Sequence, residues 1–342
     1  MAKRVEEGKL MAASRDRIPI LDIARYLAGE QGAIETLTSV VTQTCLDTGF
    51  LVVCGHGVPK TVIDQAFQSA AAFFALDSSS KLTLKVGREN IGYLPYGGQT
   101  VRTSTVHRNT KPNFSESFYI TTPDPDPTRG EGNDDRNRWP VGMLAFKDTQ
   151  ITYFRTMRAL AHRLLPIFAR ALDLADDYFD SDFVGPASTV RLIEYAPQLD
   201  DEADKFGFAP HTDGSFITLL PQSSLPGLEV RTKSGDWIRP PSTPGTLVVN
   251  TGEMLAHYSN DRFVPTPHRV INRSSEIRHA MPFFYGPNRH KVITCVPTCV
   301  SESNPARYRP STSFERNAIK DKLNFPHRQT AEFSGQNYRA AR

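Results

Sequence analysis

His211 and Asp213 are the residues whose types and spacing most directly indicate chemistry. They stand two positions apart in the segment HTDGSFITLL (211–220), which has the composition of a β-strand. Successive side chains of a strand point to opposite faces, so the imidazole and the carboxylate would share one face while Thr212 points away. A histidine and a carboxylate held side by side in this way predict two ligands of a metal ion.

A third candidate ligand is His268, in the later segment TPHRVIN (266–272). This segment also reads as a strand, and a neighbouring strand can place His268 opposite the first pair. Two histidines and one carboxylate are typical of non-haem Fe(II) centres that keep coordination positions open. The same set also suits tetrahedral zinc, as in a zinc hydrolase, although no Glu beside the ligands is placed as an obvious general base.

Arg278 is the fourth residue of chemical interest. It begins the segment RHAMPFFYG (278–286), whose other residues are mostly apolar or aromatic. An unpaired guanidinium is costly to bury, so Arg278 needs an anion if the segment lies inside the protein. Its planar fork matches a carboxylate through two N–H bonds, which would suit one end of a dicarboxylic co-substrate. A surface salt bridge is the alternative interpretation.

The elements that must position these side chains change in character along the chain. The first half is mixed and largely helical, with a Pro- and Asp-rich loop over 121–140. The patterns there predict strands over 18–23 and 49–58 and helices over 31–47, after Pro59 and over 146–174. After about residue 186, short β-branched or aromatic runs separated by turn residues predict a strand-rich region.

These patterns favour an α+β fold with a double-stranded β-helix (jelly-roll) core and a flanking helical layer. We expect a single domain over 1–342, in which a helix-rich region (1–185) packs on the jelly-roll core (186–300). The tail (301–342) contains FERNAIKDKL (314–323), which is a plausible helix. Such a helix would be able to cover the mouth of the barrel.

The chain resembles the isopenicillin N synthase-like family of Fe(II)/2-oxoglutarate-dependent dioxygenases. Besides HTDGSFITLL and TPHRVIN, further segments resemble family signposts in the same order, among them IPILDI, GFLVVCGHGV, NFSESF, RLIEYAP, GTLVVNTGEML and PFFYGP. The resemblance implies that His211, Asp213 and His268 bind the iron. It also implies that Arg278 and Tyr195 hold the C5 carboxylate of 2-oxoglutarate.

Two residues depart from the family pattern. Ala280 stands where the family usually has Ser. The loss of the serine hydroxyl removes one hydrogen bond and should weaken binding of the co-substrate by ~1 kcal/mol. By strand alternation Ala280 still faces the same side as Arg278. Ile193 stands two residues before Tyr195, where many plant members have Asn. Either change is also compatible with an altered co-substrate pocket.

The resemblance further implies the reaction and its reagents. The enzyme would use Fe(II), 2-oxoglutarate and O2 to oxidise a small organic metabolite by hydroxylation, desaturation or ring formation, with release of succinate and CO2, in specialised metabolism. Phe284 is expected to face the substrate, with core packing as the alternative, and Val270 to wall the co-substrate pocket. Tyr93, Arg102 and Phe118 are candidates for the rim of the mouth.

Composition excludes several other classes of protein. The net charge of +3 comes from 40 basic and 37 acidic residues spread along the chain, which argues against a nucleic-acid partner. The apolar runs are far shorter than the ~20 residues of a membrane span, and the N-terminus lacks the apolar core of a secretory signal. We therefore expect a cytoplasmic enzyme with no obligate protein partner. An iron oxidase that needs no 2-oxoglutarate and a non-catalytic metal-binding barrel remain alternatives.

Overall fold

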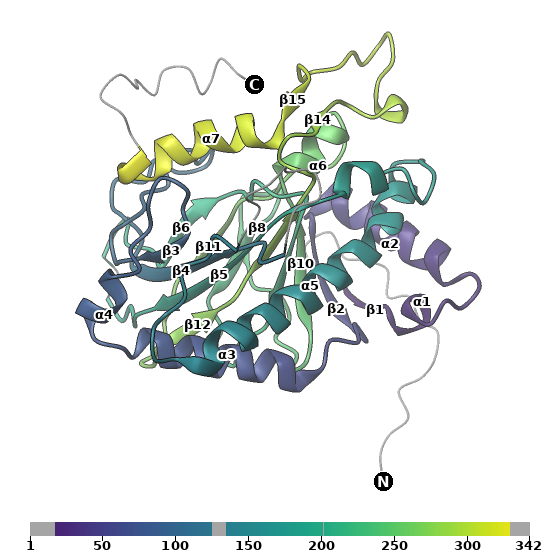
Figure 1. Cartoon of the computed structure of the whole chain (residues 1–342). Helices are drawn as coiled ribbons and strands as arrows, with labels where there is room; N and C mark the ends of the chain where they lie inside the picture. The colour runs from purple at the N-terminus through teal and green to yellow at the C-terminus, as the bar shows by residue number, and fades with distance from the viewer. Residues whose placement is uncertain (1–17, 125–134, 201, 329–342) are drawn as a thin grey trace.

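A large, mostly antiparallel sheet forms the centre of the computed structural model, which describes residues 18–124, 135–200 and 202–328 (Figure 1). Its strand order is β1-β2-β10-β7-β13-β5-β4-β3, and β12 also pairs with β5. The nine strands are β1 (Ile20–Asp22), β2 (Phe50–Cys54), β3 (Gly92–Leu94), β4 (Ser115–Thr121), β5 (Ala187–Tyr195), β7 (Ile217–Pro221), β10 (Leu247–Thr251), β12 (Arg278–Ala280) and β13 (Phe283–Gly286).

A second, four-stranded sheet packs against the large one. Its order is β6-β11-β8-β9, with β6 (Phe208–His211), β8 (Leu228–Arg231), β9 (Trp237–Ile238) and β11 (His268–Val270). Val52 and Ile193 of the large sheet share an apolar cluster with Phe208 and Val230 of the small one. The two sheets thus enclose the interior of a sandwich, which confirms the predicted jelly-roll core. A short pair, β14 (Val292–Ile293) and β15 (Ser311–Thr312), lies apart from both sheets.

The central strands are buried on both faces, which explains their nearly continuous apolar sequences. In β2, Leu51 and Val53 belong to the cluster that packs under the helices. Phe50 and Val52 alternate with them and belong to the cluster between the two sheets. The large sheet therefore separates two apolar cores, and the side chains that face the sandwich interior are the ones that can reach a site there.

The helical layer covers the outer face of the large sheet. The long helix α5 packs against α2, α3 and β13 (Figure 1). Its buried residues, such as Phe154, Met157, Leu164 and Phe168, recur at helical spacing. The helices are α1 (Ala24–Leu27), α2 (Ala33–Asp47), α3 (Lys60–Phe74), α4 (Ser78–Leu82), α5 (Leu144–Ala171), α6 (Glu253–Tyr258) and α7 (Ser313–Asn324), with 3-10 turns at Asp180–Phe183, Pro297–Cys299 and Pro326–Arg328.

The N-terminal region contributes strands as well as helices. β1 to β4 all belong to the large sheet, where β2 lies beside β10 and β4 beside β5. The expected boundary at 185/186 therefore crosses one continuous sheet. The prediction that Tyr93 and Phe118 rim the mouth is wrong, because both are buried in the core under the helices. Arg102 is exposed and lies outside the cavity described below.

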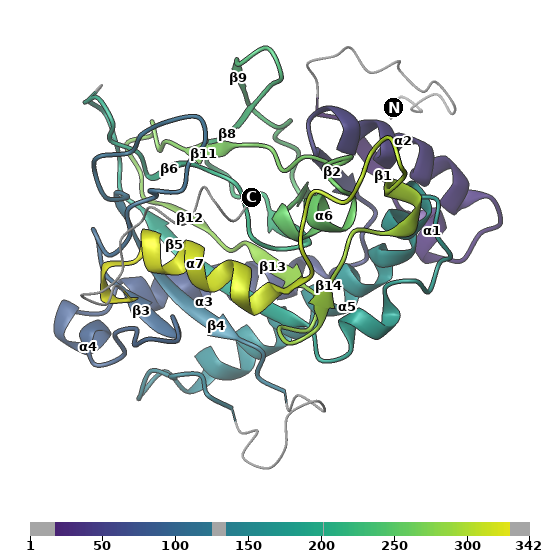
Figure 2. The same cartoon turned by 90° about the horizontal axis from the view of Figure 1, so that it is seen from above.

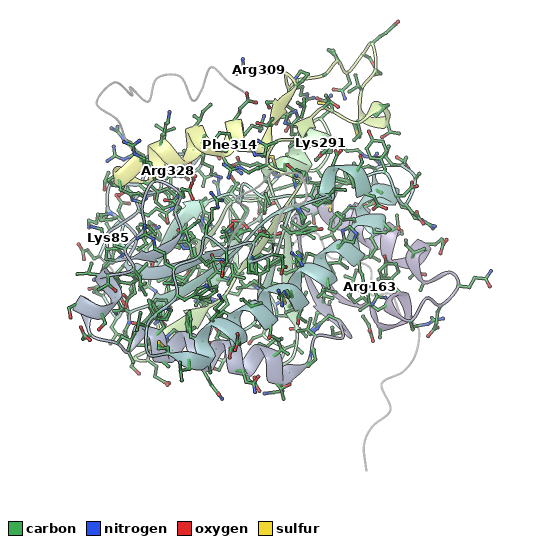
Figure 3. The ribbon with its side chains drawn as sticks, in the orientation of Figure 1. Lys85, Arg163, Lys291, Arg309, Phe314 and Arg328 are labelled. Atoms are coloured by element: carbon green, nitrogen blue, oxygen red, sulfur yellow. The ribbon has the colours of Figure 1, made fainter. Side chains whose placement is uncertain are left out.

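The terminal helix α7 lies where the sequence predicted one. A capping box begins it: the backbone N–H of Glu315 donates to Thr312 Oγ1 at 3.2 Å, and that of Thr312 donates to the Glu315 carboxylate at 2.8 Å. Figure 2 shows α7 crossing in front of β4, β5 and β13. Phe314 at its start and Arg328 just beyond its end are marked in Figure 3. Across the described ranges, no helix is both long and apolar enough to cross a membrane.

Lys81 and Glu116 form a buried ion pair that joins α4 to β4. Their side chains are 8% and 3% exposed, and Lys81 Nζ lies 2.9 and 3.0 Å from the two carboxylate oxygens. The Tyr93 hydroxyl donates to the same carboxylate. Glu116 therefore has a structural role, since it ties α4 and β3 to β4.

Removing Lys81 should destabilise the fold strongly. In Lys81→Ala the Glu116 carboxylate loses its counter-charge inside the protein, which should cost about 3–5 kcal/mol of unfolding free energy. Lys60→Ala is the matched control, because Lys60 pairs with Asp64 on the exposed surface and should cost less than about 1 kcal/mol. Urea unfolding measures both values, and equal losses in the two variants would contradict the assignment.

Candidate functional site

His211, Asp213 and His268 meet at one point of the sandwich. β6 and β11 pair in antiparallel orientation with His268 directly opposite His211, and the two ring centres lie 4.2 Å apart. Asp213 lies two residues beyond the end of β6 rather than within the strand as predicted. One ligand atom of each residue nevertheless lies within 4.8 Å of the other two. The strand pairing thus brings together three donors from distant parts of the chain.

Backbone carbonyls fix the orientation of both imidazoles. Nδ1 of His211 lies 2.9 Å from the carbonyl oxygen of Ala209, and Nδ1 of His268 lies 3.1 Å from that of Thr266. A carbonyl oxygen only accepts, so each Nδ1 must carry the proton and donate it. Each Nε2 is then left with a lone pair, and both Nε2 atoms lie 3.5 Å from Asp213 Oδ1.

The Asp213 carboxylate is oriented by two donors on neighbouring strands. Thr218 Oγ1 of β7 donates to Oδ2 at 2.7 Å, and Asn250 Nδ2 of β10 donates to the same oxygen at 2.8 Å. Both donors act on Oδ2, which leaves Oδ1 turned toward the two histidines. One carboxylate oxygen therefore accepts the hydrogen bonds and the other stays available, as in a carboxylate that binds a metal through a single oxygen.

The protonation states suit metal binding. Burial, reinforced by the neighbouring His268, lowers the pKa of His211 to about 4, so its imidazole is neutral at neutral pH. Burial alone would raise the pKa of Asp213, but His268 and His211 outweigh it and hold that pKa well below its usual range. A neutral imidazole and an ionised carboxylate are the ligand forms.

The donor set fits a non-haem iron ion better than a hydrolytic zinc centre. Two imidazole nitrogens and one carboxylate oxygen leave coordination positions open, and His211 and Asp213 line a cavity into which these positions would face. A zinc hydrolase also needs a general base. Glu253, which contacts the neighbouring Thr212, is instead held by Lys320 at 2.8 Å.

Arg278 and Tyr195 lie opposite each other on paired strands β12 and β5. The guanidinium carbon of Arg278 is 5.1 Å from the centre of the Tyr195 ring. Arg278 is only 5% exposed; its Nε donates to the Leu225 carbonyl at 3.1 Å, while its Nη1 is buried without a partner among the described residues. Burial lowers the pKa of Arg278, and Tyr195 opposes that shift. A buried cation with an unsatisfied donor predicts an anionic ligand.

Two glycines make room for this pair. A Cβ atom on Gly207 would lie 2.8 Å from the Tyr195 ring, and one on Gly227 would lie 3.0 Å from Arg278 Nε. Neighbouring loops therefore approach the pair more closely than any larger residue allows. Val270 and Ala280 belong to the same apolar cluster as Tyr195, so Arg278 is enclosed by apolar side chains on this side.

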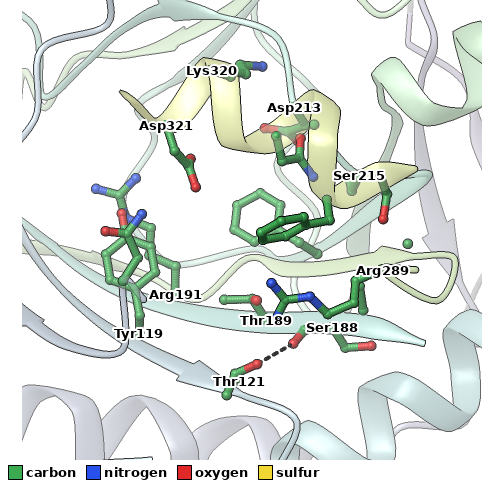
Figure 4. A pocket seen from close by; sticks show the side chains of 18 of the residues that line it. Tyr119, Thr121, Ser188, Thr189, Arg191, Asp213, Ser215, Arg289, Lys320 and Asp321 are labelled. Carbon is green, nitrogen blue, oxygen red and sulfur yellow. Dashed lines mark hydrogen bonds between the residues drawn. The ribbon is translucent and has the colours of Figure 1, made fainter. Parts of the chain in front are cut away.

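A cavity of about 780 Å³ opens beside the histidine and aspartate side chains. Phe208 and Phe284 contribute apolar walls, and α7 contributes a mostly polar one that includes Lys320 and Asp321 (Figure 4). Lys320 fastens α7 to the segment that carries the donors, because its Nζ donates to the Thr212 carbonyl at 2.5 Å. The helix predicted to cover the barrel mouth thus forms part of the cavity wall.

Comparison with known proteins places this geometry in a family. The model of the 2OG-Fe(II) oxygenase superfamily matches residues 186–287, and that of the non-haem dioxygenase in morphine synthesis N-terminal region matches 18–142. A 2-oxoglutarate-Fe(II) type oxidoreductase of Emericella nidulans is 31% identical over 304 residues, which cover 86% of each chain. The chain belongs to the 2-oxoglutarate/Fe(II)-dependent oxygenase superfamily. It is an oxidoreductase whose co-substrates are 2-oxoglutarate and O2 and whose metal is Fe(II).

Two further relatives of this oxygenase are informative. Clavatol oxidase of Penicillium crustosum is 30% identical over 291 residues, covering 79% of this chain and 86% of its own. The solved structure of a full-length Neurospora crassa protein in complex with α-ketoglutarate (2-oxoglutarate) and thymine has a TM-score of 0.76 and 27% identity. The match covers 90% of this chain and 96% of the Neurospora chain. The fold is therefore shared over nearly the whole length.

The structure of this oxygenase separates the predicted site residues into two groups. His211, Asp213 and Phe284 line the cavity. His268, Arg278, Tyr195 and Val270 are not among the lining residues; Tyr195 and Val270 are buried in the apolar cluster that also contains Phe208. Their roles stay predictions, but their placement is compatible with a substrate side and a co-substrate side of the metal.

Sequence reasoning missed three residues of this oxygenase's site. Arg191 lines the cavity and was available from the pattern, because it alternates with Ile193 and Tyr195 on β5. Thr218 and Asn250 had no such signal. They reach Asp213 only through the pairing of β7 with β10, which single-residue patterns do not encode.

The hydroxyl of Thr218 should tune metal affinity. Thr218→Val keeps the shape but removes one donor to Asp213 Oδ2, and loss of such an outer contact should weaken Fe(II) binding by about 10- to 100-fold. Thr189→Val, which removes another cavity hydroxyl not bonded to Asp213, should change the affinity less than about twofold. Anaerobic competition against a coloured chelator measures both. Unchanged affinity in Thr218→Val would contradict the role.

Proposed function

We propose that His211, Asp213 and His268 bind the Fe(II) of this oxygenase and that Arg278 and Tyr195 bind the distal carboxylate of 2-oxoglutarate. One observation carries the proposal. Each of the three side chains has two polar atoms, and one of them is already hydrogen-bonded. Nδ1 of each imidazole is bonded to a backbone carbonyl, and Oδ2 of Asp213 is bonded to Thr218 and Asn250, while the two Nε2 atoms and Oδ1 converge. Three largely buried acceptor atoms that face one another without a donor between them are unfavourable unless a cation binds there.

The co-substrate role of Arg278 follows from its environment. Its buried, unpartnered Nη1 needs an acceptor, and the planar guanidinium suits a carboxylate. Tyr195 packs against the cation and adds a hydroxyl on the same strand pair. Ala280, two residues after Arg278, has no side-chain donor, so this end of the co-substrate would be held with one hydrogen bond fewer than a serine at this position would allow.

The chemistry itself comes from the bound reagents: oxidation of 2-oxoglutarate to succinate and CO2 by O2 at Fe(II) is coupled to oxidation of the substrate. The residues of this chain position and shield that reaction. Phe208 packs against His211 with ring centres 4.2 Å apart, and Phe50 packs edge-on against His268 at 5.2 Å. These rings keep water from the protein side of the metal, which strengthens electrostatic contacts there.

The substrate is proposed to be a small organic molecule of specialised metabolism that lies in the cavity against Phe284. The cavity has the volume of a small-molecule site and opens onto His211 and Asp213. Its relatives support this class, since the Neurospora crassa structure is a complex with thymine and clavatol oxidase bears the name of a small metabolite. Whether the product is hydroxylated, desaturated or cyclised depends on the substrate, which a product analysis by mass spectrometry would establish.

Metal-dependent binding of 2-oxoglutarate tests the ligand assignment. The wild-type protein should bind 2-oxoglutarate only with Fe(II) or Mn(II) present, and should release succinate slowly in air even without substrate. Asp213→Ala should abolish both, because it removes the anionic ligand. Asp64→Ala, at an exposed surface pair, should behave as wild type. Isothermal titration and succinate quantification measure the outcomes; full metal-dependent binding in Asp213→Ala would contradict the proposal.

Two substitutions should move 2-oxoglutarate affinity in opposite directions. Arg278→Gln removes the charged guanidinium and should lower the affinity for 2-oxoglutarate by about 10- to 100-fold. Ala280→Ser introduces the serine hydroxyl and should strengthen binding of 2-oxoglutarate by about 1 kcal/mol, or roughly fivefold. Fe(II) affinity without co-substrate should stay unchanged in both variants. If Arg278→Gln binds 2-oxoglutarate like wild type, the distal carboxylate is held elsewhere.

A further inference from the structure

Arg191 is a buried cation on the cavity side of the metal site. It lies on β5 between Thr189 and Ile193 and is only 5% exposed, yet it lines the cavity. Its guanidinium carbon lies 4.8 Å from the centre of the Tyr119 ring and 4.7 Å from that of Phe208. Two aromatic rings thus lie beside the cation, and they stabilise its charge without accepting its N–H hydrogen bonds as a carboxylate would.

The hydrogen bonds of Arg191 leave its positive charge without a counter-charge. Its Nε donates to Ser117 Oγ at 2.9 Å, a neutral acceptor. Within 18–124, 135–200 and 202–328, no carboxylate forms an ion pair with Arg191. The cavity acids outside the metal site have other partners: Asp321 pairs with Arg328, Asp124 with Arg155 and Arg158, and Glu89 with Arg136.

A second polar group at the same place is also unsatisfied. The hydroxyl of Tyr119 is buried and has no hydrogen-bond partner in the described structure, although Tyr119 lines the cavity. Figure 4 shows Tyr119 and Arg191 together, across the cavity from the helix that carries Lys320 and Asp321. Burying a charge and a hydroxyl without partners is costly, so the pair is expected to be completed by an anionic ligand with further acceptor atoms.

Arg191 is also close to the metal donors. Phe208 contacts both, with its ring 4.7 Å from the Arg191 guanidinium carbon and 4.2 Å from the His211 ring centre. A single aromatic side chain therefore spans the distance between the cation and a ligand of the proposed iron. Arg278, in contrast, lies outside the cavity against Tyr195. Both cations act electrostatically on Tyr195, and of the two only Arg191 borders the cavity.

We infer that Arg191 binds a carboxylate of the substrate that the enzyme oxidises. The apolar part of this substrate lies between Phe208 and Phe284, beside the metal. The inference rests on the proposed function, because it assigns the cavity to the substrate and Arg278 to 2-oxoglutarate. It narrows the substrate class to small organic carboxylates with an aromatic or alicyclic body. A carboxylate fixed at Arg191 would present carbon atoms of that body to the metal at a set distance.

Direct binding to the anaerobic protein loaded with Mn(II) and 2-oxoglutarate tests this inference. The probes are benzoate, phenylacetate and cyclohexanecarboxylate, each compared with its primary amide by isothermal titration. The carboxylates should bind the wild type at least about tenfold more tightly than the amides, because only they neutralise the buried cation. A wild-type protein that prefers none of the carboxylates to its amide overturns the inference and points to a neutral carbonyl ligand.

Variants of Arg191 give the second arm. Arg191→Gln should lose about 10- to 100-fold in carboxylate affinity, and Arg191→Lys, which keeps the charge without the planar fork, should lose less. Arg88→Gln removes the same charge at the exposed edge of the cavity and should change affinity less than about threefold, because solvent screens it. Equal carboxylate binding by Arg191→Gln and wild type overturns the inference.

Measurements of 2-oxoglutarate separate this inference from the proposed function. Arg191→Gln should bind 2-oxoglutarate within about twofold of wild type, and a parallel loss would assign Arg191 to the co-substrate and overturn the inference. Failure of the proposed function would show instead as absent metal-dependent 2-oxoglutarate binding in the wild type, a readout in which Arg191 has no part. If Arg191→Gln does not fold, the wild-type comparison of acids with amides and the Arg191→Lys variant still decide the question.

Discussion

The antiparallel pairing of β6 with β11 is the interaction on which the rest of the site depends. It places His268 directly opposite His211, although the two residues are far apart in the sequence. Each imidazole then bonds the carbonyl two residues before it, so the same local geometry orients both rings and both tautomers. The backbone sets the direction of the metal-facing nitrogens before any metal is present, and this preorganisation lowers the cost of binding one.

The double burial of the large sheet explains how this arrangement is kept dry and rigid. One face packs under α2, α3 and α5, and the other closes the sandwich in which the donors lie. In such a low-dielectric interior the hydrogen bonds of Thr218 and Asn250 to Asp213 are stronger than in water, and unpaired charges are more costly. The same physics makes Arg191 and Arg278 informative, because both are buried and neither forms an ion pair with a carboxylate among the described residues.

The sequence allowed much of the fold to be predicted, and its errors have physical causes. α5 was found because apolar residues repeat with a period of about four along it, and β2 because a short run of β-branched and apolar residues ends in turn residues. The strands expected within the helix-rich first 185 residues could not be assigned to a sheet, because strand pairing is not a local property: nothing in β2 says that it pairs with β10. Tyr93 and Phe118 were misplaced since an aromatic residue in a polar-flanked segment reads equally as rim or core.

Prediction of the site followed the same rule. His211 and Asp213 were accessible because their spacing is local, and Arg278 because a lone arginine in an apolar strand demands an explanation. Thr218 and Asn250 were not, since they reach Asp213 only through the pairing of β7 and β10. The position of Arg191 on the same face as Tyr195 could have been predicted from the alternation of side chains on β5. Its importance could not, because it depends on burial without a counter-charge, which only the structure shows.

The central claim is that three side chains bind one iron ion, and anomalous diffraction at the iron absorption edge tests it most directly. Crystals grown without oxygen in the presence of Fe(II) and 2-oxoglutarate should show a single strong anomalous peak within bonding distance of Nε2 of His211, Nε2 of His268 and Oδ1 of Asp213. A peak at another position, or an iron ion bound to the first pair with the His268 imidazole turned away from it, would contradict the account.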